Sequence, residues 1–242
     1  MMKSYKARGI VLHTMKYGES SMIVFMLTDA IGRQNYMVQG IRSARSKGNK
    51  AALFQPMFVV DFVGLESPKM QMHRMQEVRS GVTLTSLPFD VRKSTIALFM
   101  AETLYRLIKE VEPQSPLFGF VEESVAALDG LKDGIANFHL WFMVRLSAHL
   151  GFYPGNEYIP GGYFDIQEGL FARSMPQHRL ALSAENSRIL DTFMCLGVDG
   201  LASVNLARTQ RSEFLAALLT YFGYHLDSIH NVRSLDILRD VF

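Results

Sequence analysis

The chain has 242 residues, of which 48% are hydrophobic and 20% charged, so its composition is that of a globular protein rather than a disordered one. It contains no apolar run of the roughly 18 residues needed to cross a bilayer, and no apolar signal core follows its start. We therefore expect a cytoplasmic protein. The single cysteine, Cys195, excludes an internal disulfide, and its apolar neighbours predict a buried core thiol.

Five strands are predicted in the first 80 residues, at 6–14, 22–28, 33–39, 58–63 and 69–78. The second is continuously apolar, as expected for a strand that is covered on both sides. A short turn that contains Gly32 joins it to the third strand. Five short strands with uneven connections favour a small closed or partly open barrel.

The apolar period becomes helical from residue 88 onward. Asp90 is the expected N-cap of the first helix, which should end at Pro113 and Pro116. Further helices are predicted at residues 117–128, 135–150, 184–196, 212–226 and 234–241. Glycines punctuate residues 151–182, which we expect to be irregular with short extended pieces. The fold class is therefore α+β, with a β-barrel domain at 1–80, an α-helical domain at 81–242 and a boundary at 81–88.

Charge is unevenly distributed along the chain. Residues 1–80 carry 12 Lys and Arg against 5 Asp and Glu, whereas residues 81–242 carry 13 against 18. An asymmetry of this size predicts that the first part meets a polyanion. A chance excess of cations on a solvated face is the alternative.

The densest group of cations lies in residues 40–50, among small and polar neighbours. Such a segment cannot bury itself, so we expect a solvent-facing loop held between barrel strands. Each phosphate that it neutralises would release counterions, which favours DNA binding over a merely solvated loop. The predicted DNA-binding residues are Lys16, Arg33, Tyr36, Arg42, Arg45, Lys47, Lys50, Lys69 and Arg74.

The role of Tyr36 stays open at this point, because an aromatic ring in a small barrel can either fill the interior or stack on bases. Phe54 and Phe58 are expected in the core.

Motifs for catalysis are not found in the sequence. No two of the seven histidines have His-x-x-x-His spacing, and the glycines form no phosphate-binding loop. Glu122 and Glu123 are adjacent and therefore point to different helix faces. We expect no enzyme, although a hydrolase assembled from residues far apart in the sequence remains an alternative.

Several short motifs resemble the RecO family of bacterial recombination mediators. They are Ala-Arg-Gly-Ile-Val-Leu at 7–12, Tyr-Gly-Glu-Ser-Ser at 17–21, Leu-Phe-Gln-Pro at 53–56 and Leu-Gly-Phe-x-Pro at 150–154. The resemblance implies an N-terminal OB-fold, followed by a helical domain, in a nucleoid-associated protein. It implies binding and annealing of single- and double-stranded DNA, together with loading of RecA. The implied partners are RecR, in some bacteria RecF, and the acidic C-terminal tail of the single-stranded DNA-binding protein.

Many relatives carry two Cys-x-x-Cys pairs that bind zinc after the Leu-Gly-Phe-x-Pro motif. The matching positions here are Tyr158, Gly161, Ala172 and Met175, so we expect neither zinc nor another cofactor. Apolar burial of aromatic side chains would replace the metal, at Tyr158, Tyr163, Phe164 and Phe171.

Candidate residues for contacts with proteins are Arg106, Lys109, Arg145, Arg208 and Arg211. The alternative function is an adaptor that binds only proteins and never nucleic acid.

Overall fold

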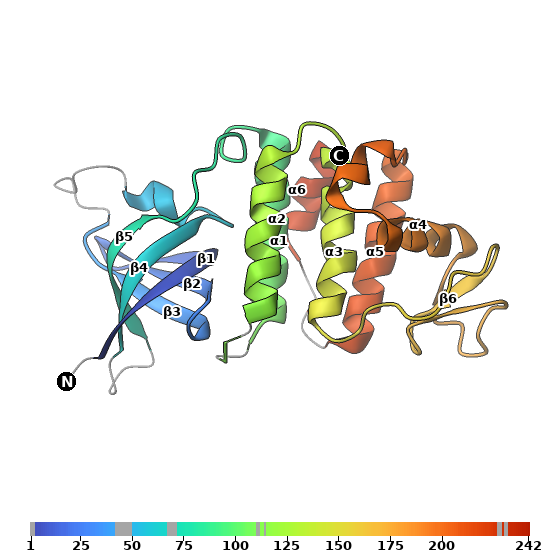
Figure 1. Ribbon diagram of the computed structural model, residues 1–242, viewed down its shortest axis with the longest axis horizontal. Helices are drawn as coiled ribbons and strands as arrows, with labels where there is room; N and C mark the ends of the chain where they lie inside the picture. Colours follow the sequence, from blue (N-terminus) through green and yellow to red (C-terminus); the bar gives the residue numbers. More distant parts are fainter. Residues whose placement is uncertain are drawn as a thin grey trace. The chain divides into compact units, whose positions relative to one another are not determined.

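The computed structural model describes residues 3–41, 50–66, 72–109, 112–113, 115–226, 229 and 232–242, and every structural statement below concerns these residues. Contacts between residues divide the chain into two compact units, Met1–Asp129 and Gly130–Phe242 (Figure 1). The first two helices thus group with the barrel strands. The strands end at Ser80 and the first helix begins at Val91, so the change from strands to helices lies at the predicted boundary of 81–88. A division into domains at this boundary stays a prediction.

The first unit is built on a five-stranded barrel, as the sequence predicts. The strands pair in the order β1-β2-β3-β5-β4, and β4 pairs with β1 to complete the circle. All pairs are antiparallel except β3 with β5, a short parallel seam of two residue pairs, Tyr36 with His73 and Met37 with Arg74. This is the OB-type arrangement. The strand bounds are β1 Lys3–Tyr17, β2 Ser21–Thr28, β3 Gly32–Val38, β4 Val59–Glu66 and β5 His73–Ser80.

Alternate side chains of each strand fill the barrel interior. Val24, Tyr36 and Phe62 are examples from three different strands. Position 64 requires glycine, because the ring of Tyr5 lies over Gly64 and a Cβ there would come within 2.3 Å of that ring. The turn Lys50–Phe54, a short 3₁₀ helix that the sequence analysis did not predict, also places the Phe54 side chain in this core.

Two helices complete the first unit, α1 (Val91–Leu107) and α2 (Ser115–Gly130). Asp90 caps α1 as predicted, since its carboxylate accepts a hydrogen bond from the backbone N–H of Arg92 at 2.9 Å. Helix α1 ends at Leu107, before both prolines, and α2 begins at Ser115, two residues before its predicted start, so that it includes Pro116. This residue lies in the first turn of α2, where proline is tolerated because the N–H that it lacks would have no partner within the helix.

The connection from β5 to α1 is fixed on the end of α2 by Asp129. Its carboxylate accepts hydrogen bonds from the backbone N–H groups of Thr85, Ser86 and Leu87 at 2.7 to 2.9 Å. Burial raises the pKa of Asp129, but these hydrogen bonds outweigh that effect and lower the pKa to about 2. The buried Lys93 ammonium donates to the Asp129 carbonyl oxygen at 2.7 Å, so both ends of this residue are bound.

The second unit contains four α-helices among its described residues: α3 Phe138–His149, α4 Ala184–Cys195, α5 Arg208–His225 and α6 Ser234–Val241. Residues Ile135–Asn137 and Val198–Ser203 form 3₁₀ turns. Helix α5 begins four residues earlier than predicted. The side chain of Gln210 reaches back to accept the N–H of Ala207 at 2.8 Å and stabilises that earlier start.

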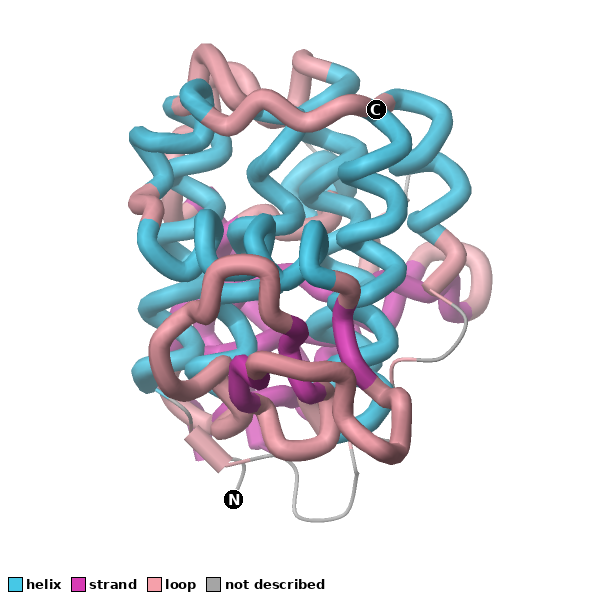
Figure 2. The backbone as a smooth tube through the Cα atoms, turned by 90° about the vertical axis from the view of Figure 1, so that its right-hand side faces the viewer, coloured by secondary structure: helices cyan, strands magenta, loops and turns pink. Residues whose placement is uncertain are grey.

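Residues 151–182 form a small sheet joined by long loops, with strand order β7-β6-β8 (Figure 2). The strands are β6 Tyr163–Asp165, β7 Leu170–Ala172 and β8 Ala181–Leu182. Phe164 and Phe171 are buried with ring centroids 5.1 Å apart, while Tyr158 and Tyr163 are partly exposed. Aromatic packing therefore holds the centre of this insertion.

Cys195 is exposed at the last residue of α4, so the expectation of a buried thiol was wrong. Within the described residues, no group of three His, Cys, Asp or Glu side chains is placed to hold a metal ion. None of the helices in the described part of the chain combines the length and the apolar character that a bilayer span requires.

Candidate nucleic-acid interface

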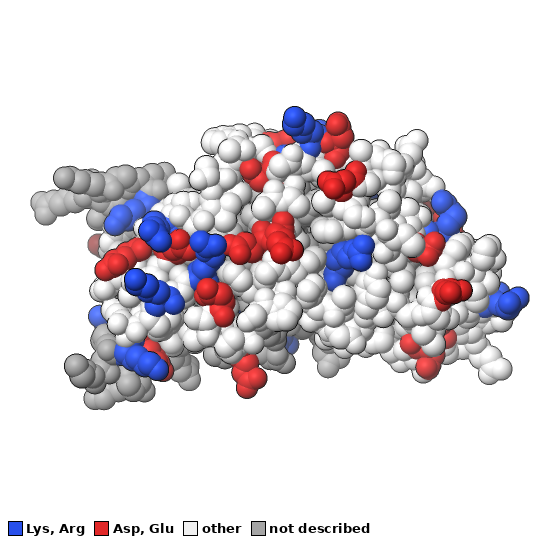
Figure 3. Space-filling model, in the orientation of Figure 1, with Lys and Arg blue, Asp and Glu red and all other residues white. Residues whose placement is uncertain are grey.

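Lysines on the barrel surface point into solvent. Lys16 at the end of β1 and Lys50 at the start of the 3₁₀ turn are both exposed, as are Lys3 and Lys6 on β1. Lysine and arginine side chains interleave with acidic ones over the barrel, at the left of Figure 3. Four other predicted cations lie outside the described residues: Arg42, Arg45, Lys47 and Lys69.

Two exposed apolar side chains flank Lys16. Met15 is 47% exposed and Tyr17 is 50% exposed. They belong to the part of β1 that pairs only with β2, where Met15 lies opposite Ile23 and Tyr17 opposite Ser21. OB-folds commonly bind oligonucleotides on the face of β2 and β3 and with the loop after β1. A tyrosine ring beside a lysine at this loop can stack on a base while the cation meets a phosphate.

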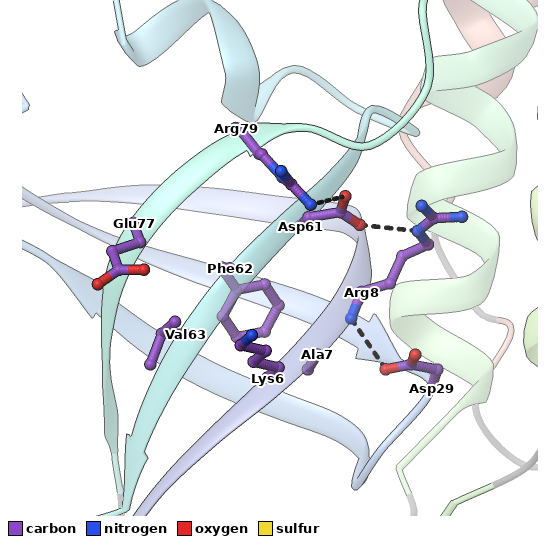
Figure 4. A pocket seen from close by; sticks show the side chains of 9 residues that line it. All are labelled: Lys6, Ala7, Arg8, Asp29, Asp61, Phe62, Val63, Glu77 and Arg79. Carbon is purple, nitrogen blue, oxygen red and sulfur yellow. Dashed lines mark hydrogen bonds and ion pairs between the residues drawn. The ribbon is translucent and has the colours of Figure 1, made fainter.

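A surface pocket of about 580 Å³ lies on the outer side of β1, β4 and β5. At its centre Asp61 binds two cations from neighbouring strands: Arg8 Nε donates to Oδ1 at 2.8 Å, and Arg79 Nη2 lies 3.3 Å from Oδ2 (Figure 4). The hydrogen bond from Arg8 lowers the pKa of Asp61 and raises that of Arg8. Arg8 also binds Glu122 of α2 at 3.0 Å, so its charge is already compensated twice.

The strand register explains why Arg79 reaches this pocket. Between Val63 and Asp61 β4 advances two residues, while β5 advances three, from Gln76 to Arg79. The additional residue lies next to Glu77, which adopts a left-handed conformation with φ of 51°. The bulge turns the Arg79 side chain toward Asp61, yet that side chain remains 79% exposed.

Arg33, one of the predicted DNA-binding residues, is bound within the fold. Its guanidinium packs over the Tyr105 ring, 4.6 Å from the centroid, and donates hydrogen bonds to the carbonyl oxygens of Tyr105, at 2.9 Å, and Ile108. Burial lowers the pKa of Arg33. Because these carbonyls lie at the C-terminal end of α1, Arg33 holds that helix end on the barrel.

Tyr36 is also not available to a nucleic acid, because its side chain is fully buried in the barrel core. Of the two interpretations left open, filling the interior is the one that the structure shows. The Tyr36 hydroxyl is hydrogen-bonded to that of Tyr5 at 3.0 Å, and the Tyr5 hydroxyl lies 2.7 Å from Nδ1 of His73. Burial, and then the hydrogen bond with Tyr5, raise the pKa of Tyr36.

Arg74 is partly buried on the outer side of the β3–β5 seam, between Met37 and Leu65. Its Nε atom is buried and has no hydrogen-bond partner among the described residues. It therefore offers less of its charge to a ligand than Lys6, Lys16 or Lys50 does.

The candidate protein-contact residues have different surroundings in the two units. In the first unit, Arg106 forms an ion pair with Glu102 at 2.6 Å, while Lys109 is exposed. In the second unit, Arg145 donates to the carbonyl oxygen of Leu196 at 2.9 Å. Arg208 and Arg211 donate to the backbone carbonyl oxygens of Arg239 and Leu206, respectively.

Sequence reasoning missed Lys6, Arg79, Met15 and Tyr17 as members of the exposed surface. The signal for Tyr17 was present, since it is an aromatic residue directly before the Gly18 turn. No local pattern distinguishes Arg79, because its position depends on the bulge at Glu77 and on Asp61 of another strand.

The barrel and the helical remainder each match one half of a known pair of domains. Residues 2–80 match the family described as Recombination protein O N terminal, and residues 88–235 match Recombination protein O C terminal. Matches to both halves in this order place the chain in a class of bacterial DNA repair proteins.

Curated relatives agree over nearly the full length. The chain is 37% identical to "DNA repair protein RecO" of Bacteroides fragilis and 34% identical to that of Phocaeicola vulgatus, with 98% of both chains covered in each case. It is 33% identical to the protein of the same name from Flavobacterium psychrophilum, again over 98% of both chains. The chain belongs to the RecO family of DNA repair proteins.

Proposed function

We propose that this chain is a DNA-binding recombination mediator that carries out no bond cleavage. It binds single- and double-stranded DNA with the barrel, anneals complementary strands and, with RecR, helps to load RecA on DNA coated by the single-stranded DNA-binding protein. The protein is cytoplasmic and associated with the nucleoid. It needs no zinc or other cofactor. RecF is a further partner. The exposure of Lys6, Lys16 and Lys50 on an OB-type barrel is the observation that carries this proposal.

The physical basis of annealing is charge screening. Two DNA strands repel each other, and exposed ammonium groups lower that repulsion without reading sequence. Lysine is suited to this role because its charge is compact and its stem is flexible, so it follows an irregular backbone. Tyr17 adds a stacking surface, which favours unpaired bases over a closed duplex.

The decisive experiment replaces Lys6, Lys16 and Lys50 together with alanine and measures binding of a fluorescent single-stranded oligonucleotide over a range of salt concentrations. Each lost phosphate contact should flatten the plot of log K against log salt by about 0.7. The matched control is Lys132→Ala, which removes an exposed lysine from the helical unit. Its slope should equal that of the wild type.

An unchanged slope in the triple variant would remove these lysines from the interface. A second variant, with Arg42, Arg45, Lys47 and Lys50 replaced by alanine, tests the basic segment in the same way. If the wild type binds no oligonucleotide at low salt and does not accelerate strand annealing, the adaptor that binds only proteins is the better description.

A further inference from the structure

The last residues of β1 are paired with another strand on one side only. The strand pairs with β4 over residues 3–10 and with β2 over residues 9–17. The backbone of Val11 is still bound on the side away from β2, by the residues that precede β4. Over residues 13–17, no described residue is hydrogen-bonded to the backbone on that side. This open edge, residues 13–17, therefore carries backbone N–H and C=O groups that an added strand can bind.

The side chains of the open edge do little to prevent such pairing. Met15 is 47% exposed and Tyr17 is 50% exposed, and His13 is exposed as well. Proteins commonly protect an exposed edge with proline or with several charged side chains. The open edge contains no proline and, apart from His13, one cation, Lys16. It therefore has the properties of a strand that pairs with another chain.

The order of residues in the open edge favours a second copy of this chain as its partner. Two copies of one strand edge pair antiparallel around a two-fold axis, so the residue on the axis faces itself. With Met15 on the axis, His13 faces Tyr17 of the second copy. Thr14 then faces Lys16. All five residues are paired in this register, and no like charges lie opposite each other.

The two neighbouring registers are less favourable. With Lys16 on the axis, two ammonium groups lie directly opposite each other, which is destabilising. With Thr14 on the axis, Tyr17 of the second copy meets Val11, whose backbone is already bound on that side. The register with Met15 on the axis is thus the one that uses the whole open edge without repulsion.

This register also adds apolar contacts. The His13 ring lies 5.7 Å from that of Phe25 in β2 and 4.9 Å from that of Tyr105 in α1, measured between centroids. Tyr17 of the second copy, opposite His13, would extend this aromatic group. Both ends of the joined edge therefore gain an aromatic contact, and the centre gains a contact between two Met15 side chains.

We propose that residues 13–17 form a self-association site, at which two copies of the chain join their barrels edge to edge around Met15. Edge pairing uses backbone groups and leaves the faces of the sheet open. The two Tyr17 rings then lie on one face, where each can still meet a base. The inference goes beyond DNA binding, because the pairing needs no nucleic acid. Its use in annealing, where two barrels each bring one strand, rests on the proposed function.

The test measures the oligomeric state of the full chain by sedimentation velocity. We expect the wild type to be a monomer in dilute solution and a dimer at about 100 µM, since a small interface gives weak association. Met15→Lys and Met15→Glu each place like charges opposite each other on the axis, so each variant alone should stay a monomer. An equimolar mixture of the two should restore the dimer, because unlike charges then meet.

Met175→Lys is the matched control, since it makes the same change at a methionine of similar exposure, 45%, in the helical unit. It should dimerise like the wild type. Dimers that persist in both Met15 variants would overturn the assigned edge. A wild type that stays monomeric at the higher concentration would overturn self-association and leave the edge to a strand of another protein.

Cysteine cross-linking tests the register in a Cys195→Ser background. Met15→Cys should form a disulfide between two chains under mild oxidation, because residues on the axis have neighbouring Cβ atoms. Lys16→Cys should not, since the two copies of that residue lie about 8 Å apart, beyond the reach of a disulfide. Equal cross-linking at both positions would overturn the register. All these measurements are made without nucleic acid, so their outcome is independent of the oligonucleotide test of the barrel lysines.

Discussion

The barrel and the helical unit use their cations in opposite ways. On the barrel, Lys6 and Lys16 extend into solvent with no carboxylate bound to them among the described residues. In the helical unit, Arg145, Arg208 and Arg211 donate to the backbone carbonyl oxygens of Leu196, Arg239 and Leu206, respectively. The planar guanidinium has several donors in a fixed array and can bind carbonyls, whereas an ammonium on a flexible stem stays hydrated. In these examples the exposed lysines are free to meet a ligand, whereas the arginines bind atoms of the fold.

The largest expected effect concerns His139 of α3, which is buried in the helical unit near the charge of Arg211. The pKa of His139 is about 3 in the folded chain, against an ordinary value of 6.5. Between these values the unfolded chain binds the extra proton, so the free energy of unfolding falls as pH falls, by at most about 1.4 kcal/mol per pH unit. We expect His139→Phe to flatten this dependence in urea titrations at pH 7, 5.5 and 4.

His149→Gln is the control for that experiment, because His149 is exposed at the end of the same helix. It should keep the slope of the wild type. Equal slopes for wild type and His139→Phe would show that the buried histidine does not govern acid sensitivity.

Arg33 is a barrel cation that is bound within the fold, and its replacement should have the next largest effect. Arg33→Ala leaves the carbonyl oxygens of Tyr105 and Ile108 without this donor and removes the contact with the Tyr105 ring. We expect a loss of about 2 kcal/mol in the free energy of unfolding. A change as small as that of Lys16→Ala would mean that Arg33 does not anchor α1.

Replacement of Arg145 in the helical unit should lower the free energy of unfolding by less than replacement of Arg33. The Leu196 carbonyl oxygen accepts a hydrogen bond from Arg145 at 2.9 Å and a second from Trp141 Nε1 at 3.2 Å. Arg145→Ala leaves the second donor in place, so we expect a loss of about 1 kcal/mol by urea titration. A loss above that for Arg33→Ala would reverse the expected order of the two arginines.

The smallest effect on stability belongs to the exposed lysines. Lys6→Ala should change the free energy of unfolding by less than about 0.5 kcal/mol, because no hydrogen bond or ion pair of its ammonium is found among the described residues. Its affinity for an oligonucleotide should fall nonetheless. A thermal unfolding curve and an anisotropy titration on the same sample separate the two effects, and a clear loss of stability would contradict the comparison.

Much of the fold could be predicted because periodicity is a local signal. The apolar run at residues 22–28 became β2, and the helical spacing after Asp90 became α1. Short turns were missed where contacts distant in sequence decide them, as at Lys50–Phe54, whose Phe54 enters the barrel core. The early start of α5 depends on one side chain, Gln210, that reaches back to the backbone.

The candidate interface was harder to predict, because charge is visible in a sequence but exposure is not. Arg33 and Lys16 look alike as isolated cations, yet Tyr105 of α1, 72 residues away in the chain, binds the first and not the second. Tyr36 was undecided for the same reason, since its position against Tyr5 and Phe62 fixes it inside the barrel. Tertiary neighbours, which no pattern in residues 1–80 encodes, made these distinctions.

The hydrogen bond from Trp141 to Leu196 has a practical consequence. Trp141 is the only tryptophan in the chain, and the peptide unit it reaches directly follows Cys195, the only cysteine. Indole fluorescence therefore reports on the Gly130–Phe242 unit alone, without background from the barrel. An acceptor dye on the exposed Cys195 thiol would form an energy-transfer pair with Trp141, without any substitution in the chain. Unfolding of the Gly130–Phe242 unit can then be followed while an oligonucleotide is bound to the barrel.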